Sequence, residues 1–313
     1  MANYLVTGGA GFIGSHIVRH LVALKQSVRV IDNLSSGRLE KLGDVLDKIE
    51  FVKGDIRDQN VVISVMEGID YVLHQAALRS VPRSMTRPGD YNDVNVWGTL
   101  NLLMAARNQE VKHFVLASSS SVYGLNDIFP QEEGLTTIPI SPYALTKLMG
   151  EQYCSLFSRA FHLPTTSLRY FNVFGPRQGL DDDYAVVVPK FIVSLSSNIS
   201  PPIYGDGKQS RDFTYVDNVV AANLACCLSH DKISKVYNVA CGETHSVLEL
   251  FEILSRLLKS SVKPTFQPPR PGDVYKSHAD ISSIQRDIQW RPLVGFEEGL
   301  IRTIQWFREN PIS

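Results

Sequence analysis

The amino-acid sequence predicts an α/β fold in which a doubly wound parallel sheet carries helices on both faces. Short apolar runs alternate with segments of helical periodicity through the first half of the chain, at the spacing of β-α-β units. The second half has longer, proline-rich loops between shorter elements. With 313 residues, 44% of them hydrophobic, the chain can form a large domain and a smaller one. We predict a first domain over residues 1–175, to which later segments return, and a second over residues 176–313.

The first expected element is a strand at residues 4–7 that runs into a glycine-rich turn. Helical spacing follows on one face, at Ile13, Ile17, Leu21 and Leu24. Glycines between a strand and a helix let the backbone turn sharply and bring its N–H groups close to a pyrophosphate. The turn therefore predicts a Rossmann-type dinucleotide site, with contacts from Gly8, Gly11, Phe12, Ile13 and Gly14.

The second strand, at residues 28–31, ends at Asp32. A carboxylate there can accept hydrogen bonds from the adenosine ribose, and it would repel the 2′-phosphate of NADP. NAD is therefore the expected cofactor. Arg38 follows shortly, and an arginine there could hold that phosphate, but we interpret it as a solvated loop charge. The polar loop before it is expected beside the adenosine, with contacts from Asn33, Ser36 and Gly37.

The third and fourth strands are expected at residues 51–53 and 71–74. The third leads to Asp55, whose carboxylate can accept from the adenine amino group, and to Ile56. The fourth ends in small residues that let a cofactor lie flat against the backbone, in the run Gln75, Ala76 and Ala77. His74 is interpreted as a strand-end histidine satisfied by local hydrogen bonds.

Residues 78–84 are rich in donors and too irregular for a helix or a strand, so we expect them over the carboxyl edge of the sheet. A helix at residues 92–108 carries Asn95, a further expected cofactor contact. The fifth strand, residues 113–117, runs into serines at 118–121. Further along, the sequence predicts strands at residues 166–170 and 236–239, and a helix at 246–259 that begins with a capping box.

A second motif is the segment at residues 141–147. Ser141 can cap a helix whose first residue is Pro142. Tyr143 and Lys147 then lie one turn apart on the same face. A tyrosine has an ordinary pKa of about 10, and a neighbouring ammonium and a positive nicotinamide ring would bring that pKa toward neutrality. Tyr143 is thus a candidate base, with a hydroxyl of Ser119 or Ser120 sharing the substrate proton.

Charge and cysteine content exclude several other classes of function. The formal net charge of −1 gives no electrostatic case for nucleic acid or for a membrane surface, and no apolar run is long enough to cross a bilayer. The N-terminus does not read as a signal peptide. The four cysteines form no metal-type pair, so no metal site is expected, and we interpret them as reduced thiols of a cytoplasmic protein.

Taken together, these residues resemble the extended short-chain dehydrogenase/reductase family along nearly the whole chain. The similarity lies in residues 7–14, Asp32, Asp55, the serines with residues 122–124, the Tyr143 and Lys147 pair, and residues 168–176. Within that family the chain is similar to nucleotide-sugar 4-epimerases. The resemblance implies that tightly bound NAD takes a hydride from sugar C4 while the tyrosine takes the hydroxyl proton, and that the 4-keto sugar is then reduced on its other face. It also adds Tyr170 to the cofactor contacts.

The resemblance further implies a site for a UDP-sugar. Arginine forks suit diphosphate oxygens and a carboxylate suits a ribose diol. The implied nucleotide contacts are Asn172, Val187 and Lys190 within the stretch 185–190, Tyr204, Arg211, Arg270 and Asp273. The remaining implied substrate contacts are Ser80, Ser119, Ser120, Tyr143 and Ser277.

Ser277 bears on the choice of sugar. Hexose-restricted epimerases resemble one another in carrying a tyrosine at this place, whereas those that accept N-acetylhexosamines carry a smaller residue. A serine leaves room for a 2-acetamido group, so UDP-N-acetylglucosamine and UDP-N-acetylgalactosamine are the expected substrates, with UDP-glucose and UDP-galactose as further ones. The loop at residues 80–84 is also similar to that of the N-acetylhexosamine enzymes, although Arg79 replaces their glycine.

Three alternatives remain beside this interpretation. A 4,6-dehydratase is disfavoured because Ser120 and Ser121 stand where those enzymes carry an acid-base pair. A UDP-glucuronate 4-epimerase or decarboxylase would need a cationic pocket, which Arg79 or Arg83 could supply. An NAD-binding sensor would usually lack the Tyr143 and Lys147 pair. The family resemblance also implies a homodimer through the helices at residues 92–108 and 143–161.

Overall fold

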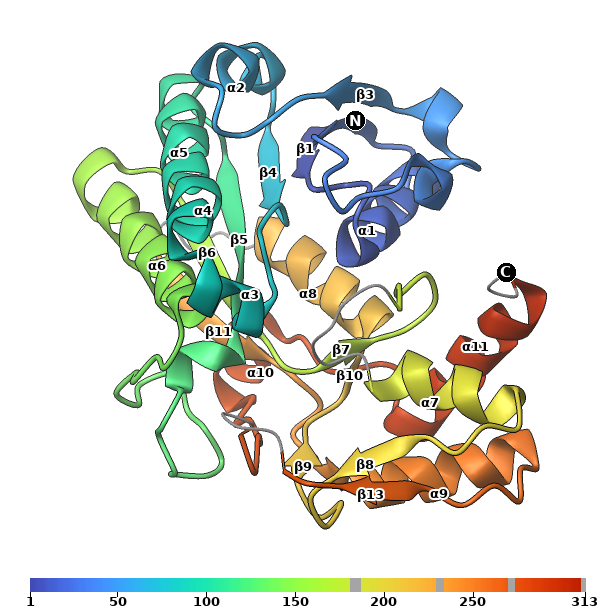
Figure 1. Ribbon diagram of the computed structural model, residues 1–313. Coiled ribbons are helices and arrows are strands. Elements are labelled where there is room, and N and C mark those ends of the chain that lie inside the picture. Colours follow the sequence, from blue (N-terminus) through green and yellow to red (C-terminus); the bar gives the residue numbers. More distant parts are fainter. Residues whose placement is uncertain (181–186, 229–233, 270–273, 311–313) are drawn as a thin grey trace.

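The computed structural model describes residues 1–180, 187–228, 234–269 and 274–310. Its centre is a seven-stranded sheet (Figure 1). The strands are β1 (Asn3–Thr7), β2 (Ser27–Asp32), β3 (Glu50–Lys53), β4 (Tyr71–His74), β5 (His113–Ser119), β6 (Thr165–Tyr170) and β11 (Lys235–Val239). They lie in the order β11-β6-β5-β4-β1-β2-β3, and every neighbouring pair is parallel. The predicted doubly wound fold class is therefore confirmed.

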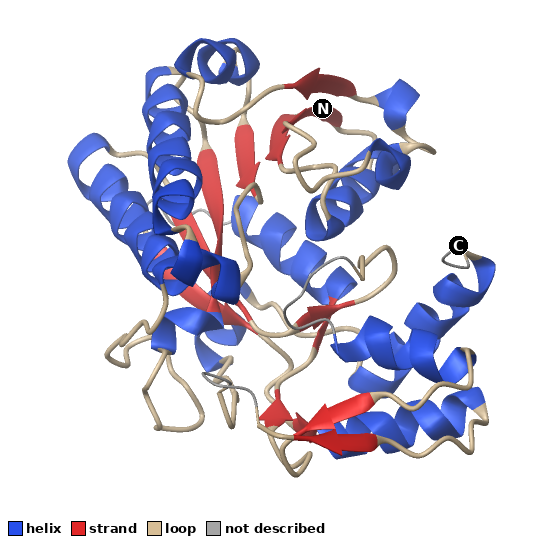
Figure 2. Ribbon diagram, viewed as in Figure 1, coloured by secondary structure: helices blue, strands red, loops and turns tan. Residues whose placement is uncertain are grey.

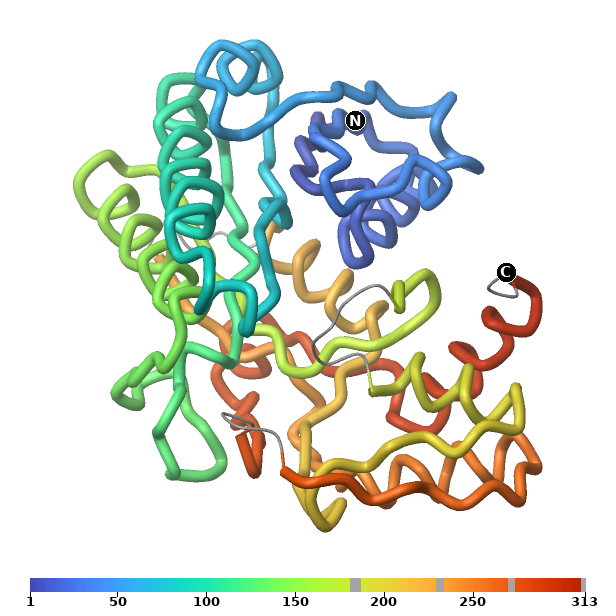
Figure 3. The backbone as a smooth tube through the Cα atoms, in the orientation of Figure 1, coloured from blue at the N-terminus to red at the C-terminus, as the bar shows by residue number. Residues whose placement is uncertain are grey.

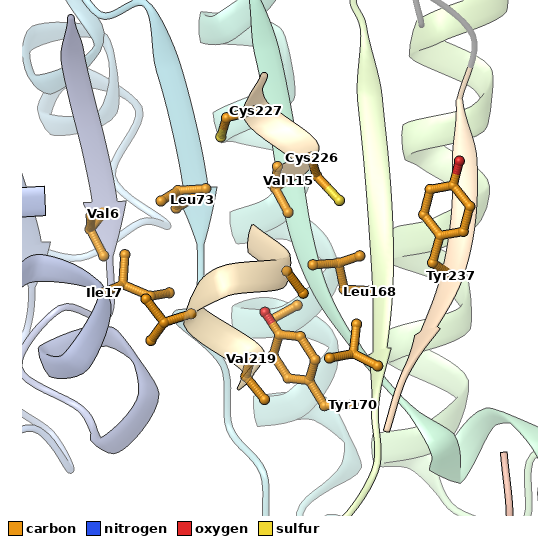
Figure 4. Packing of buried hydrophobic residues seen from close by; sticks show 14 of the residues in the cluster. Val6, Ile17, Leu73, Val115, Leu168, Tyr170, Val219, Cys226, Cys227 and Tyr237 are labelled. Carbon is orange, nitrogen blue, oxygen red and sulfur yellow. The ribbon is translucent and has the colours of Figure 1, made fainter. Parts of the chain in front are cut away.

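Helices cover both faces of this sheet (Figure 2). One face packs against α1 (Phe12–Ala23) and α8 (Val216–Cys227). The other packs against α2 (Gln59–Met66), α5 (Gly98–Asn108) and α6 (Pro142–Phe161). Figure 4 shows the first of these layers, where Ile17 and Val219 meet strand residues such as Leu73. All four cysteines are free thiols, and Cys226 and Cys227 at the end of α8 are buried in this core.

A smaller region lies below the carboxyl edge of the sheet (Figure 3). Its own apolar core joins α7 (Val187–Ser196), α9 (Val247–Leu258) and α11 (Phe296–Glu309). The predicted capping box of α9, between Ser246 and Glu249, is present. Its short strands are β7 (Val173–Phe174) paired with β10 (Thr214–Tyr215), β8 (Pro202–Tyr204) with β13 (Thr265–Gln267), and β9 (Ser210–Arg211) with β12 (His245–Ser246). The helix α10 (Ser282–Ile288) packs near β11.

Three local predictions need correction. Residues 78–84 are not wholly irregular, because α3 (Val81–Thr86) forms where Ser80 caps the N–H of Arg83. The helix expected at 92–108 begins earlier, as α4 (Pro88–Tyr91), and continues through a π-helical turn at Asn92–Trp97 before α5. Leu24 lies just past the end of α1 and is exposed instead of facing the core.

Two further observations concern the chain as a whole. β11 returns from the second half of the sequence to pair with β6 at the edge of the main sheet. The domain boundary at residue 175 stays a prediction. None of the helices in the described ranges is long and apolar enough to cross a membrane.

Candidate functional site

Two cavities open along the carboxyl edge of the sheet and meet at Tyr143. The larger, of about 430 Å³, extends into the smaller region of the molecule. The other follows the glycine turn and the ends of β2, β3 and β4. The residues that line both are Phe12, Ile13, Arg79, Ser118, Tyr143 and Tyr170. Ligands in the two cavities would therefore come closest at these shared residues, of which Tyr143 is one.

The glycine turn forms a backbone cradle that side chains would fill. Gly8 has a φ of +68°, and a Cβ there would lie 2.8 Å from the backbone N of Ala76. A Cβ on Gly14 would lie 2.2 Å from the carbonyl oxygen of Gly8. The first turn of α1 faces the same cavity, so its unpaired N–H groups are available to an anion. This cradle fits the pyrophosphate of a dinucleotide.

Asp32 lies at the end of β2 on the wall of this cavity. Its carboxylate accepts hydrogen bonds from Ala10 N at 3.0 Å and Leu34 N at 2.8 Å. Burial raises the pKa of Asp32, and these two backbone N–H groups oppose the rise. Arg38 is exposed, in agreement with its interpretation as a loop charge. Asp55, also on the wall, pairs with Arg57, and this pairing lowers its pKa.

The remaining predicted cofactor contacts are placed as follows. The same cavity is lined by Gly11, Asn33, Ser36, Gly37, Ile56, Gln75, Ala76, Ala77 and Lys147. Asn95 does not line it. Its amide accepts from Leu78 N at 2.8 Å and donates to Leu78 O at 2.9 Å and to Thr146 Oγ1 at 3.0 Å. Asn95 therefore fixes the loop that follows β4 against α6.

The helix α6 delivers Tyr143 and Lys147 as the sequence predicts. Ser141 caps it by accepting from Ala144 N, and Pro142 occupies its first position. Burial raises the pKa of the Tyr143 phenol, while a side-chain hydrogen bond with Ser119 and the charge of Arg79 lower it. Of the candidate hydroxyls, that of Ser119 is thus the one bonded to Tyr143. The opposing charge comes from Arg79 in place of the Lys147 that the sequence suggested.

Lys147 is only 7% exposed, and its ammonium donates to Ala117 O at 2.8 Å. Burial lowers its pKa to about 8, and the charge of Glu151 opposes that fall. The nearby His74 is bonded on both ring nitrogens, to Thr7 Oγ1 and Thr99 Oγ1. Burial and then the charge of Lys147 lower the pKa of His74 to about 3, so it is neutral at physiological pH. The interpretation of His74 as a satisfied core histidine is confirmed.

The larger cavity collects predicted substrate contacts from distant segments: Ser119, Ser120, Asn172, Val187, Lys190, Tyr204, Arg211 and Ser277. Asn172 has a φ of +32° and donates to Ser277 Oγ at 2.8 Å. Ser277 is 8% exposed, so it is a wall residue and not a solvent-facing serine. Arg270 and Asp273 lie outside the described residues. Ser80 lies beyond the cavity wall, where it caps α3.

Sequence reasoning missed two buried residues that shape the site, Asp212 and Asn223. Asp212 is buried behind Asn172 and accepts from the backbone N–H groups of Cys241, Gly242 and Ala279. Burial raises its pKa to about 7, against those hydrogen bonds. Asn223 on α8 bonds both Gln75 and Tyr170 beneath the junction of the cavities. Neither has a local sequence signal, because each acts on residues distant in the chain.

Comparisons with known proteins agree with this geometry. The model of the NAD dependent epimerase/dehydratase family matches residues 4–240. A UDP-glucose 4-epimerase of Mycolicibacterium smegmatis is 37% identical over 310 residues, which cover 98% of each chain.

Two solved structures have nearly the same fold. One is a UDP-N-acetylglucosamine 4-epimerase from Methanobrevibacter ruminantium M1 in complex with UDP-N-acetylmuramic acid, at 42% identity and a TM-score of 0.94, with 98% of each chain covered. The other is a UDP-glucose 4-epimerase from Thermotoga maritima with UDP-glucose, at 38% identity and a TM-score of 0.93, with 98% of this chain and 99% of that chain covered. With the glycine cradle, Asp32 and the family match in agreement, this chain belongs to the NAD-dependent epimerase/dehydratase family, whose members act on nucleotide sugars.

Proposed function

We propose that this protein catalyses the 4-epimerisation of a UDP-sugar, with UDP-N-acetylglucosamine and UDP-N-acetylgalactosamine as its main substrates. The observation that carries the proposal is that Tyr143 lines both cavities, because the hydride must leave sugar C4 while the proton leaves the hydroxyl oxygen on that same carbon. Ser277 supports the choice of sugar, since this small side chain lines the larger cavity. UDP-glucose and UDP-galactose are proposed as additional substrates.

In this mechanism Tyr143 takes the proton of the sugar C4 hydroxyl and later returns it, and Ser119 shares that proton through its hydrogen bond to the phenol. When bound in the cavity lined by the glycine turn, Asp32 and Lys147, NAD would supply the reversible oxidation of sugar C4 and the positive charge of its oxidised ring. Lys147 adds a buried positive charge on the same helix face. Asn172 and Arg211 orient the diphosphate, and arginine forks suit phosphate oxygens.

The experiment is to remove the phenolic oxygen. Tyr143→Phe should lower kcat by about 1,000-fold while NAD and UDP-sugar binding stay within about twofold, since only the proton-transfer atom is lost. Tyr153→Phe, on the same helix but outside both cavities, is the matched control and should keep full activity. Retention of most activity by Tyr143→Phe would overturn the proposal.

The sugar is tested by incubating the purified protein separately with UDP-N-acetylglucosamine, UDP-glucose and UDP-glucuronate, and following the C4 epimers by NMR. The rival function, a UDP-glucuronate 4-epimerase or decarboxylase, draws support from Arg79, which lines both cavities, whereas Arg83 lines neither. Turnover of UDP-glucuronate alone would favour that rival. No turnover of any sugar with added NAD would favour a sensor.

We also propose that the protein is a homodimer. Large apolar side chains are exposed along α6 and the turn that precedes α5: Trp97, Leu145, Leu156 and Phe161. Of the other large apolar residues on α6, Phe157 and Leu148 pack into the core and are not available to this interface. Sedimentation equilibrium tests the dimer, and Leu156→Glu should shift it to monomer.

A further inference from the structure

The helix α6 carries a third ionisable side chain below the predicted base. Tyr143, Lys147 and Glu151 lie on consecutive turns of the same face. Glu151 is 3% exposed and lines neither cavity, so it touches no substrate or cofactor directly. A buried carboxylate in this place needs an explanation, because burying a charge is unfavourable unless it is paired.

Arg169 on β6 pairs with Glu151 through two hydrogen bonds. Its Nε donates to Oε1 at 3.0 Å and its Nη2 donates to Oε2 at 2.8 Å. Ser118 Oγ also donates to Oε1, at 2.5 Å. Ser118 and Arg169 face each other across β5 and β6, so the carboxylate joins both strands to the helix. Ser118 lines both cavities and precedes Ser119, so the pairing reaches the edge of the site.

The guanidinium of Arg169 is held on its other sides as well. It lies 4.8 Å from the centroid of the Tyr123 ring, and its Nη1 donates to Glu133 O at 3.2 Å. Arg169 is 4% exposed. Burial disfavours its charge, yet the hydrogen bonds and charge of Glu151 keep the pKa of Arg169 above its ordinary value. The pair is therefore fixed in one arrangement.

Three charges are thus buried in one row: the Lys147 ammonium, the Glu151 carboxylate and the Arg169 guanidinium. We propose that Glu151 and Arg169 are positioning residues that set the charge state of Lys147, an inference that rests on the proposed function. The carboxylate keeps the buried ammonium protonated. The guanidinium holds the carboxylate in place, so that the ammonium stays bonded to Ala117 O beside the catalytic tyrosine.

Other ionisable groups face this row from the elements packed around it. They are His74 on β4, Arg79 in the loop after β4, Tyr91 on α4, Tyr123 in the turn after β5, Glu133 in the loop before α6, and Tyr143 and Cys154 on α6. His74 is neutral above about pH 4 and cannot supply a titration near neutrality. The pKa of Lys147 is instead set by burial, which lowers it, and by the charge of Glu151, which raises it.

Removing the negative charge of Glu151 and removing the positive charge of Arg169 should shift the pKa of Lys147 in opposite directions. Glu151→Gln removes the negative charge and leaves the Arg169 cation uncompensated, so the pKa of Lys147 falls. Arg169→Gln removes the cation and leaves the carboxylate uncompensated, so that pKa rises. Each shift should be about one pH unit, the order of magnitude that one nearby charge produces in proteins. In the double variant both charges are absent, so the pKa of Lys147 should fall between the values of the two single variants.

Two readouts measure the shift. The first is the alkaline limb of the kcat profile between about pH 6 and pH 10, where activity falls as Lys147 loses its proton. The second is an NMR titration of the ¹³Cε signal of Lys147 in ¹³C-lysine protein, assigned by Lys147→Met, which needs no turnover. Arg159→Gln replaces an exposed charged residue on the same helix. It is the matched control and should change neither the kcat profile nor the NMR titration.

Shifts in the same direction for both single variants, or no shift in either, would overturn the inference, because a merely structural pair has no reason to act with opposite sign. If Glu151→Gln does not fold, Glu151→Asp keeps the charge and should leave the titration in place, while Arg169→Gln still decides the sign. An active Tyr143→Phe would refute the proposed function, whereas the NMR titration tests this inference alone.

Discussion

The two cavities are built from different parts of the chain. The glycine-turn cavity is lined mainly by short runs of consecutive residues at the ends of neighbouring strands, and we propose Asp32 as its main specificity group. The larger cavity is built from side chains that come from separate segments, such as Asn172, Arg211 and Ser277. Backbone recognition tolerates almost no added atoms, whereas side-chain recognition can be retuned one residue at a time. The following predictions test that difference.

The largest effect is expected in the glycine cradle. Gly14→Ala places a Cβ 2.2 Å from Gly8 O, so the turn must open and its N–H groups leave the cofactor. NAD affinity should fall by more than about 100-fold, measured by calorimetry and by the NAD content of the purified protein. Gly89→Ala, where a Cβ meets nothing within 4 Å, should bind NAD normally. Normal NAD binding by the Gly14 variant would show that the backbone N–H groups of the glycine turn do not hold the cofactor.

The next effect concerns stability on the substrate side. The pKa of Asp212 is raised to about 7 in the folded protein, above the ordinary value of 3.8. The folded state therefore binds this proton more readily, and stability falls as pH rises from about 4 to 7, by about 3 kcal/mol in total. Asp212→Asn should flatten this dependence in urea unfolding at about pH 5 and pH 7.5. The exposed Asp47→Asn should leave it unchanged, and an unaltered slope in the Asp212 variant would contradict the assignment.

A smaller effect is expected for sugar choice. Ser277→Tyr fills part of the larger cavity, so kcat/KM for UDP-N-acetylglucosamine should fall about 10- to 100-fold more than that for UDP-glucose. Ser277→Ala removes the hydroxyl that accepts hydrogen bonds from Asn172 Nδ2 and Asp212 N but adds no bulk, and it should slow both sugars by the same factor of about five. Equal losses for both sugars in the tyrosine variant would show that residue 277 does not select the sugar.

The smallest effect concerns the choice of dinucleotide. Asp32→Asn removes the charge that would repel a 2′-phosphate, and its single side-chain oxygen can still accept from one of the two backbone N–H groups, Ala10 N or Leu34 N. The preference for NAD over NADP should shrink by about tenfold, measured as the ratio of the two Kd values. If the variant prefers NAD over NADP as strongly as the wild type does, a group other than the Asp32 carboxylate must exclude NADP.

Sequence patterns predicted the elements around the glycine-turn cavity well because their signals are local. The strands of the main sheet, the glycine turn, Asp32 and the capped helix with Tyr143 and Lys147 each follow from a few adjacent residues. The short helix α3 was missed because a single Ser80 cap starts it within a donor-rich loop.

The substrate side was harder because its contacts are non-local. Ser277 reaches Asn172, and Asp212 reaches Cys241 and Ala279, across long stretches of chain. No periodicity or spacing encodes such pairs, so only the resemblance to a family pointed to some of them. The pKa of Tyr143 depends on the burial of its ring, which the sequence does not show.

The strand β11 has a consequence for how the chain acquires its structure during synthesis. It completes the sheet by pairing with β6, although the whole of the segment between Phe171 and Ser234 is translated first. Until Val239 has left the ribosome, β6 is an open edge with unpaired backbone groups, and such edges favour association with other chains. A nascent chain stalled before that point should therefore depend on chaperones, and a fragment ending near residue 175 should aggregate instead of folding.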